Sequence, residues 1–453
     1  MLRFTGGKAT FQGGIHPYEG KELSKDKPVR VLMPGSELVY PTRQHIGAPA
    51  VPLVKKGDRV LVGQKIADAG GFISACVICS VSGTVKAVEP RLTVGGSEVS
   101  CIVVENDGQY ETVPDFGQER DWTKLSKEEI ISIVKEAGIV GMGGAGFPTN
   151  VKLSPKDPSK IDTVIINGSE CEPYLTSDYR MMLEETETIV EGLKIELSLF
   201  PGAKGIIAVE DNKPEAIGKL RVAVKDEPDI SVLEMKTKYP EGGERMLIYA
   251  ATGRKINSSL LPADAGVIVS NIDSAIAICN AVARSTPLIR RIITVTGDAI
   301  KDPCNFNVRT GTNYKELLEA AGGFSSEPAK IISGGPMMGK ALFTVDVPVE
   351  KTSSALLCLT KDPAAQFEPT ACIRCGRCVE ACPEFLVPQK MMEVSQRHDH
   401  AAFEAMNGME CCECGSCTYV CPARRRLTQA FKEMRKEVMD IRRSKAAKPA
   451  ERK

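Results

Sequence analysis

The sequence predicts a multidomain α/β and α+β protein whose last folded domain is built around cysteines. Three observations carry this prediction. The chain of 453 residues is longer than one core of about 100–200 residues requires. Strand patterns near the N-terminus give way to helices that alternate with apolar strands. Nine of the sixteen cysteines lie between Cys372 and Cys421.

Five segments are predicted along the chain. They are an N-terminal barrel-sandwich domain (1–115), a Rossmann-like α/β domain (120–288), a β-grasp module (289–345), an α-helical domain holding the cysteine runs (362–424) and a basic tail (425–453).

The composition is that of a soluble globular chain, with 58 basic and 58 acidic residues. A formal charge of +0 argues against the basic excess by which nucleic-acid binders hold phosphates, so we expect no nucleic-acid partner. The first residues lack the apolar core of a secretory signal. The thiols are therefore expected in a reducing cytoplasm, where metal binding explains them better than disulfides. The most apolar stretch, 266–283, contains polar residues, so any membrane role is expected to be peripheral.

The N-terminal domain is predicted to consist of short antiparallel strands. Residues 54–66 and 81–88 alternate β-branched residues with Gly-Asp and Ser-Gly turns. This pattern resembles the barrel-sandwich fold of biotinyl and lipoyl carriers, which place a modified lysine in the hairpin after such a strand. The matching stretch, 68–72, has no lysine. The domain is therefore expected to be structural.

From residue 126 onward, helices and apolar strands alternate, which predicts an α/β sheet. Helices are expected at 126–137 and, as one long helix, at 176–199, and strands at 161–166, 205–209 and 266–270. A further strand-rich block begins at 292 and ends near SGGPMMG at 333–339. We interpret it as the β-grasp module. A polar linker, 361–369, leads to the cysteines.

Two matched cysteine runs predict two iron–sulfur clusters of the 4Fe-4S type. Each run has the spacing C-x2-C-x2-C-x3-C-P, in which three close cysteines wrap one cluster and the fourth reaches the other. The expected ligand sets are Cys372, Cys375 and Cys378 with Cys421, and Cys411, Cys414 and Cys417 with Cys382. Structural zinc is the alternative, but zinc takes four ligands and ordinarily two CxxC pairs.

The remaining cysteines and the histidines are assigned no metal. Cys412 breaks the spacing of its run and is expected to pack beside the cluster. Cys76 and Cys79 supply only half a metal site, and two buried thiols are the favoured interpretation. His398 and His400 are expected as solvated helix residues, and His16 and His45 as hydrogen-bonded structural residues.

The chain ends in a basic stretch. Residues 423–453 carry twelve Lys or Arg against four Asp or Glu. A solvated helix with a frayed end is favoured slightly over a docking surface for acidic partners or lipid head groups.

A glycine-rich loop, GMGGAGFPT at 141–149, follows a helix instead of the strand that a dinucleotide fingerprint requires. Glycines let backbone N–H groups approach a phosphate or a flat ring closely, although a flexible connection between elements has the same composition. Its companions favour a ligand site. Lys152 lies just beyond the loop, and 167–173 follows the carboxyl end of a strand, where α/β proteins bind ligands. Residues 241–244 and 270–271 are expected in further loops.

Taken together, these motifs resemble those of a known family, the RnfC proteins of the Rnf electron-transport complex, which are relatives of the flavin-bearing 51-kDa subunit of respiratory complex I. The resemblance runs from GGIHP at 13–17 and QHIGAP at 44–49, through the glycine-rich loop, YPEGGE at 239–244 and SGGPMMG, to the cysteine runs. It implies that 120–288 binds FMN and receives NAD(H), and that 289–345 is a soluble-ligand-binding β-grasp module.

The resemblance also implies which residues bind the flavin and the nicotinamide. By motif match they are Gly141, Gly143, Gly144, Gly146, Lys152, Asn167, Glu170, Glu172, Gly243, Glu244 and Asn271. Ser169 departs from the pattern of the complex I relative, which has an acidic residue there, and this removes one expected polar contact to the flavin. No catalytic residue is assigned.

The activity implied by the resemblance is that of an oxidoreductase and translocase subunit. NAD(H) would exchange a hydride with FMN, and the two clusters would carry single electrons to or from partner subunits. The whole complex would couple ferredoxin oxidation and NAD+ reduction to Na+ or H+ transport, with ferredoxin reached through a partner subunit. The chain is then expected as a peripheral protein at the cytoplasmic face of the bacterial cell membrane.

Two alternatives differ in observable ways. A soluble flavin and iron–sulfur reductase of the cobalamin-reductase type has similar modules, but the resemblance places its barrel-sandwich module after the cysteine runs, whereas here that module comes first. A scaffold in which the clusters are structural staples would leave the bound flavin oxidised when NADH is added.

Overall fold

The structure is a computed structural model that describes residues 4–5, 8–144 and 146–447. The chain divides into two compact units. The smaller unit combines Met1–Pro17, Lys236–Leu261 and Asp362–Lys453, and the larger unit combines Tyr18–Met235 and Pro262–Lys361. The segment 236–261, placed in the α/β domain from the sequence, therefore belongs to the same unit as the cysteine runs.

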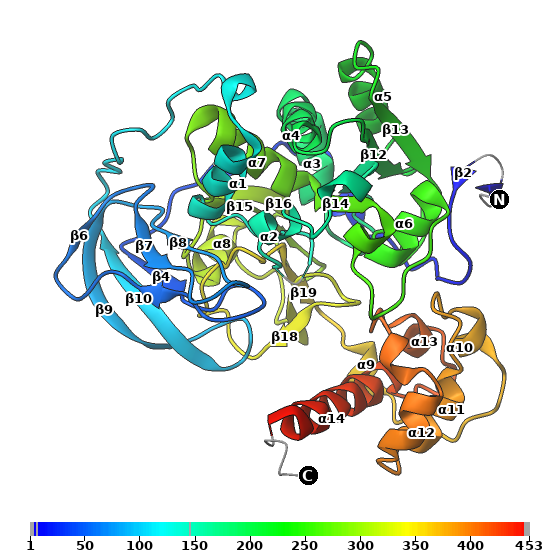
Figure 1. Cartoon of the computed structure of the whole chain (residues 1–453). Helices are drawn as coiled ribbons and strands as arrows, with labels where there is room; N and C mark the ends of the chain where they lie inside the picture. Colours follow the sequence, from blue (N-terminus) through cyan, green and yellow to red (C-terminus); the bar gives the residue numbers. More distant parts are fainter. Residues whose placement is uncertain (1–3, 6–7, 145, 448–453) are drawn as a thin grey trace, which may run out of the picture. The chain divides into compact units, whose positions relative to one another are not determined.

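The larger unit begins with two antiparallel sheets, drawn in blue and cyan in Figure 1. One has the order β4-β10-β9-β6 and the other β5-β7-β8. The strands are β4 (Glu37–Pro41), β5 (Val51–Pro52), β6 (Arg59–Val60), β7 (Lys65–Asp68), β8 (Val77–Ile78), β9 (Gly83–Leu92) and β10 (Glu98–Asn106). Leu38, Ile66, Val85 and Ile102 share one buried core. These sheets confirm the predicted antiparallel strands.

The α/β part contains parallel strands in the order β13-β12-β11-β14. The strands are β11 (Thr163–Gly168), β12 (Lys204–Glu210), β13 (Ile230–Met235) and β14 (Val267–Asn271). The helices are α1 (Lys127–Glu136), α2 (Thr149–Lys152), α3 (Ser177–Glu184), α4 (Thr186–Ser198), α5 (Pro214–Ala223) and α7 (Ile272–Arg284). A capping box between Ser126 and Glu129 starts α1 where the sequence predicts it.

The long helix predicted at 176–199 is wrong in one respect, because it is broken into α3 and α4 at Glu185. The backbone of Glu185 leaves the helical region, with φ −124° and ψ 31°. The next residue, Thr186, donates its hydroxyl to the carbonyl of Met182 at 2.6 Å. Threonine side chains that bond to a preceding carbonyl in this way disturb the helix ladder, which explains the break.

The β-grasp part forms a mixed sheet in the order β18-β17-β19-β15-β16-β3. Its elements are β3 (Arg30–Leu32), β15 (Arg290–Thr296), β16 (Cys304–Arg309), α8 (Tyr314–Ala320), β17 (Lys330–Ser333), β18 (Lys340–Leu342) and β19 (Ala355–Leu359). Two strands come from outside the predicted block. β3 arrives from near the N-terminus, and β19 follows the block.

The smaller unit has a short hairpin, helix α6 and the helical cysteine segment. Its elements are β1 (Phe4–Thr5), β2 (Lys8–Ala9), α6 (Glu244–Thr252), α9 (Pro363–Gln366), α10 (Arg377–Glu380), α11 (Pro388–Ser395), α12 (His400–Ala405), α13 (Ser416–Tyr419) and α14 (Leu427–Ala447). The first half of the predicted basic tail is not a solvated helix, because Leu427, Phe431, Met434 and Val438 of α14 join the core of the cysteine segment.

The two histidines of the spacer are also not simply solvated helix residues. His398 has φ +51° and lies outside the helices. His398 and His400 approach the carboxylate of Glu437 at 3.2 and 2.7 Å. His45, in contrast, is a buried structural residue as predicted, with ring nitrogens 3.1 Å from the carbonyls of Ile46 and Ala75. Among the described residues, none of the helices combines the length and apolarity that a membrane crossing requires.

Candidate functional site

The glycine-rich loop follows α1, as predicted, and folds back on itself. The N–H of Gly141 donates to the carbonyl of Phe147 at 2.9 Å. At Gly143 a Cβ atom would lie 3.1 Å from the side chain of Asn271, so only glycine allows this close approach. At Gly144 a Cβ atom would face open space. Gly146 has φ +70°, which favours glycine. The loop therefore brings bare backbone beside Asn271 and leaves space at Gly144.

The carboxyl ends of β11 and β14 bring two predicted residues together. Asn167 and Asn271 are partners in the register of these parallel strands. Asn271 caps α7, accepting from the N–H of Asp273 at 2.9 Å, and its amide donates to Asp178 at 2.6 Å. Lys152 donates to the carbonyl of Val269 in β14 at 2.6 Å. Glycine loop and asparagines thus meet at the sheet edge where α/β proteins bind ligands.

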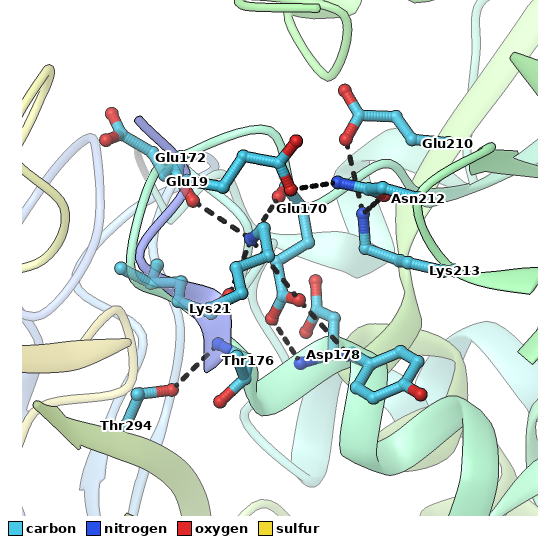
Figure 2. A network of polar contacts seen from close by, with 12 residues as sticks. Glu19, Lys21, Glu170, Glu172, Thr176, Asp178, Glu210, Asn212, Lys213 and Thr294 are labelled. Carbon is cyan, nitrogen blue, oxygen red and sulfur yellow. Dashed lines mark hydrogen bonds and ion pairs between the residues drawn. The ribbon is translucent and has the colours of Figure 1, made fainter. Parts of the chain in front are cut away.

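The loop after β11 is held by two buried lysines (Figure 2). Lys21 donates to the carbonyls of Glu170, Glu172 and Leu175 at 2.8, 3.1 and 2.6 Å. Lys213 donates to the carbonyl of Ser169 at 2.6 Å. Carbonyl oxygens of one loop are therefore gathered around two ammonium groups, and this fixes the loop backbone.

The charges of the two lysines are balanced inside the same network. The ammonium of Lys21 lies 3.8 Å from the carboxylate of Glu170, and that of Lys213 lies 3.2 Å from Glu210. The Glu170 carboxylate also accepts from the N–H groups of Asp178 and Tyr179 at 2.7 and 3.3 Å, at the start of α3. The positive end of a helix dipole favours a carboxylate at this position.

Two carboxyl groups of this network titrate away from their usual ranges. Burial raises the pKa of Glu170, although Lys21 opposes the change. Burial, with the nearby Glu170 carboxylate, raises the pKa of Asp178 to about 7. The edge of the sheet thus contains an acid that changes charge near neutral pH.

Glu172 is bound within the larger unit. Its carboxylate accepts from the N–H groups of Met337 and Met338 at 3.2 and 2.8 Å. Those residues belong to the SGGPMMG segment of the β-grasp part. Glu172 therefore joins the loop after β11 to that segment.

Gly243 and Glu244 lie in the smaller unit. Gly243 precedes α6 and Glu244 is its first residue, so Glu244 is a helix residue and not a loop residue. The other nine predicted flavin or nicotinamide residues lie in the larger unit. The sequence analysis missed Lys21, Lys213 and Asp178. Isolated charged residues carry no local signal of burial, so only the fold identifies them.

Two orphaned hydroxyls test whether a polar cofactor fits this edge. Within the described part of the chain, Ser169 Oγ and Thr149 Oγ1 are buried and make no hydrogen bond. Thr149 ends the glycine-rich motif, and Ser169 begins the loop held by the lysines. A buried polar group without a partner calls for an explanation, and a bound polar ligand supplies one. The residues present therefore fit such a ligand.

The two cysteine runs adopt matching conformations. Arg374 and Glu413, at equivalent positions, have φ +56° and +59°. Each N–H lies 3.4 Å from the sulfur of the cysteine two residues earlier, Cys372 and Cys411 respectively. The sequence repeat is therefore a structural repeat.

Each predicted ligand set gathers around one cavity. Cys372, Cys375, Cys378 and Cys421 line the first cavity. Cys382, Cys411, Cys414 and Cys417 line the second, together with Cys412. The fourth cysteine of each run thus reaches the cavity of the other run.

The chemistry of these donors fits iron–sulfur clusters. Burial raises the pKa of Cys411 and of Cys417 to about 12, so these thiols need cationic iron to be thiolates at neutral pH. Within the described residues no three Cys, His, Asp or Glu side chains converge closely enough for a single ion. Cys76 and Cys79 are buried, as predicted, and hydrogen-bond to Asp68 and Val81.

Comparison with known families matches four consecutive parts of the chain. Residues 9–109 match the RnfC barrel sandwich hybrid domain, 134–280 the Nuo51 FMN-binding domain, 292–341 the SLBB domain and 364–422 the 4Fe-4S dicluster domain. The fold and the site thus define a modular electron-transfer protein with an FMN-binding domain and a 4Fe-4S dicluster domain.

Relatives identify the family. One is the RnfC-type component of the Na(+)-translocating ferredoxin:NAD(+) oxidoreductase complex of Acetobacterium woodii, to which the chain is 44% identical over 434 residues, covering 96% of this chain and 98% of the relative. The corresponding component of the proton-translocating complex of Clostridium ljungdahlii is 45% identical over 388 residues, covering 86% and 85%. The chain belongs to the RnfC family, whose members are components of multi-subunit Rnf complexes.

A solved structure shares the fold. The crystal structure of an NAD+-reducing NiFe hydrogenase in the H2-reduced state aligns with a TM-score of 0.50 at 16% identity, covering 73% of this chain and 68% of that one. At this identity the likeness concerns the fold alone.

Proposed function

We propose that this chain is the NAD(H)- and FMN-binding electron-transfer subunit of an ion-translocating ferredoxin:NAD+ oxidoreductase. The observation that supports it best is that one chain combines an FMN-binding domain with two cavities, each lined by four cysteines. FMN, when bound, supplies the exchange between two-electron hydride chemistry and one-electron transfer.

The ligands in this proposal are eight cysteines. Cys372, Cys375, Cys378 and Cys421 hold the first cluster, and Cys382, Cys411, Cys414 and Cys417 hold the second. Cys412 packs beside the second without binding iron.

The flavin and nicotinamide are proposed to lie at the carboxyl edge of the parallel sheet. Gly141, Gly143, Gly144 and Gly146 admit the cofactor close to the backbone, and Lys152, Asn167 and Asn271 supply polar groups at that edge. Glu170 and Glu172 hold the adjoining loop in shape. Gly243 and Glu244 are assigned by motif alone.

The partners in this proposal are NAD(H) and other subunits of the complex, with ferredoxin reached through one of them and with no nucleic acid. The chain is assigned to the cytoplasmic face of the bacterial cell membrane as a peripheral subunit. The names of the relatives, which describe parts of ion-translocating complexes, support this assignment. The barrel-sandwich domain precedes the cysteines, which favours this function over a soluble reductase of the cobalamin-reductase type.

The test is an absorption spectrum of the anaerobically purified chain before and after NADH. We expect flavin and iron–sulfur absorption, and bleaching of both when NADH is added. A flavin that stays oxidised in NADH while the clusters are present would contradict the proposal and favour a scaffold.

A further inference from the structure

The two cysteine cavities differ in how the chain covers them. The cavity of the second set is enclosed, since Cys414 and Cys417 are only 8% and 9% exposed. Tyr239 donates its hydroxyl to the carbonyl of Cys414 at 2.7 Å, and Arg245 pairs with Glu384 and Glu410 at 3.2 and 3.1 Å. Segment 236–261 therefore covers this cavity within the smaller unit.

The cavity of the first set opens to the surface. Cys372 and Cys375 are exposed, and Ile373 between them is 68% exposed. The run reaches the other side of the cavity through one backbone bond, from the N–H of Thr370 to the carbonyl of Ala423 at 2.9 Å. An electron carrier that must approach a cluster closely would find this cluster, and not the second, at the surface of the unit.

Exposed arginines surround the opening. Arg374, Arg377, Arg424 and Arg426 are exposed and form no ion pair within the described residues. Arg425 is half-buried and donates to Gln396 at 3.1 Å. Over 367–380 and 421–426 the sequence has these five arginines against two carboxylates, Glu368 and Glu380.

Apolar side chains lie among the arginines. Phe367 is 48% exposed, and the guanidinium of Arg424 lies 4.8 Å from the centre of its ring. With Ile373 it gives the opening an apolar centre inside a basic rim, the usual anatomy of a protein interface. We call Phe367, Ile373, Arg374, Arg377, Arg424 and Arg426 the arginine face.

We propose that the arginine face is the docking surface for an acidic one-electron carrier protein. The inference rests on the proposed function, because it requires that the first cysteine set holds a cluster. Unpaired basic groups select an acidic partner and speed its approach, whereas the small apolar centre suits the limited contact of a transient redox encounter. The partner is distinct from NAD(H), which belongs to the larger unit.

The test uses the full complex in its membrane. Ile373 is replaced by the photo-crosslinking residue benzoylphenylalanine, and crosslinked products are identified by mass spectrometry. We expect a crosslink to a protein of acidic composition that carries its own redox centre, with a yield that falls between about 0.1 M and 1 M salt as the Debye length shortens from about 10 Å to 3 Å. The same residue at Val222, which is 74% exposed on the larger unit, is the position control.

Charge reversal supplies the matched comparison. The double variant Arg374→Glu and Arg377→Glu should lower the crosslink yield about tenfold at low salt. The double variant Lys432→Glu and Lys436→Glu changes the net charge equally on the exposed side of α14 and should leave the yield within twofold. Iron content and the midpoint potential of the exposed cluster are measured in both variants.

Three outcomes overturn the inference. They are a crosslink to lipid only, a crosslink to a protein without acidic character or a redox centre, and a changed cluster potential with an unchanged crosslink, which would make the arginines charge compensation for the cluster. The proposed function is judged separately. If NADH still bleaches flavin and clusters while the crosslink is absent, only the docking surface is wrong.

Discussion

Replacing Lys21 by methionine tests the network that holds the loop after β11. Lys21 is 8% exposed and donates to three carbonyls of one loop, while its charge faces Glu170. Methionine fills similar space but cannot donate. The three carbonyls and the Glu170 carboxylate would then be buried without this partner.

The expected cost follows from these contacts. A buried acceptor that loses its partner costs about 1–3 kcal/mol, and a buried ion pair that loses one member costs about 3–5 kcal/mol. These losses overlap, so we expect Lys21→Met to destabilise the larger unit by about 3–5 kcal/mol. At about 2–4 °C per kcal/mol, the melting temperature should fall by roughly 10 °C.

The assay is thermal denaturation followed by circular dichroism, with the fraction of bound flavin measured in parallel. Lys56→Met is the control, since Lys56 is exposed. Lys21→Gln, which keeps one donor group, should fall between the wild type and Lys21→Met and remains measurable if the methionine variant does not fold. A melting temperature of Lys21→Met within 2 °C of the wild type, about the shift expected from 1 kcal/mol, would refute the reasoning.

Three further predictions concern the clusters, the nicotinamide and pH. Cys382→Ser should lose about half of the iron, specifically the cluster that three cysteines of the other run bind, and Cys412→Ser should lose none; iron analysis with paramagnetic resonance decides this, and the opposite result would move the ligand register. Glu244→Ala should weaken bleaching of the flavin by NADH at unchanged iron content, and an unchanged NADH titration would remove Glu244 from the site. Burial raises the pKa of Asp178 from 3.8 to about 7, so the folded state holds an extra proton between these values and stability should fall as pH rises from about 4 to 7. Asp178→Asn should flatten that fall in melting temperature, whereas parallel curves for variant and wild type would contradict it.

Local patterns made the main elements predictable. The capping box at Ser126 and the apolar period behind it define α1 within one residue. Buried parallel strands such as β11 appear as short apolar runs between helices. The cysteine runs repeat a spacing whose geometry is local, and the two runs do fold alike at Arg374 and Glu413. In each of these cases the determining contacts lie within a few residues in sequence.

Long-range pairing accounts for most of what the sequence did not reveal. β3 joins the sheet of β16, although more than 270 residues separate them. A three-residue strand has too little pattern to identify its partner. The same reason hides Lys21, whose acceptors lie around 150 residues further along the chain. Its burial depends on the folded loop and not on its own neighbours in sequence.

The division of the chain into units has a practical consequence for dissecting the protein. The backbone passes between the units at 17/18, 235/236, 261/262 and 361/362. A single proteolytic cut therefore leaves each unit still joined covalently to part of the other, and no uninterrupted piece of the gene encodes either unit alone. A truncation that ends before residue 362 removes both cysteine runs but keeps α6, which would then lack the segment it packs with in its own unit. Point substitutions, rather than deletions, are thus the suitable way to separate the roles of the flavin and cluster parts.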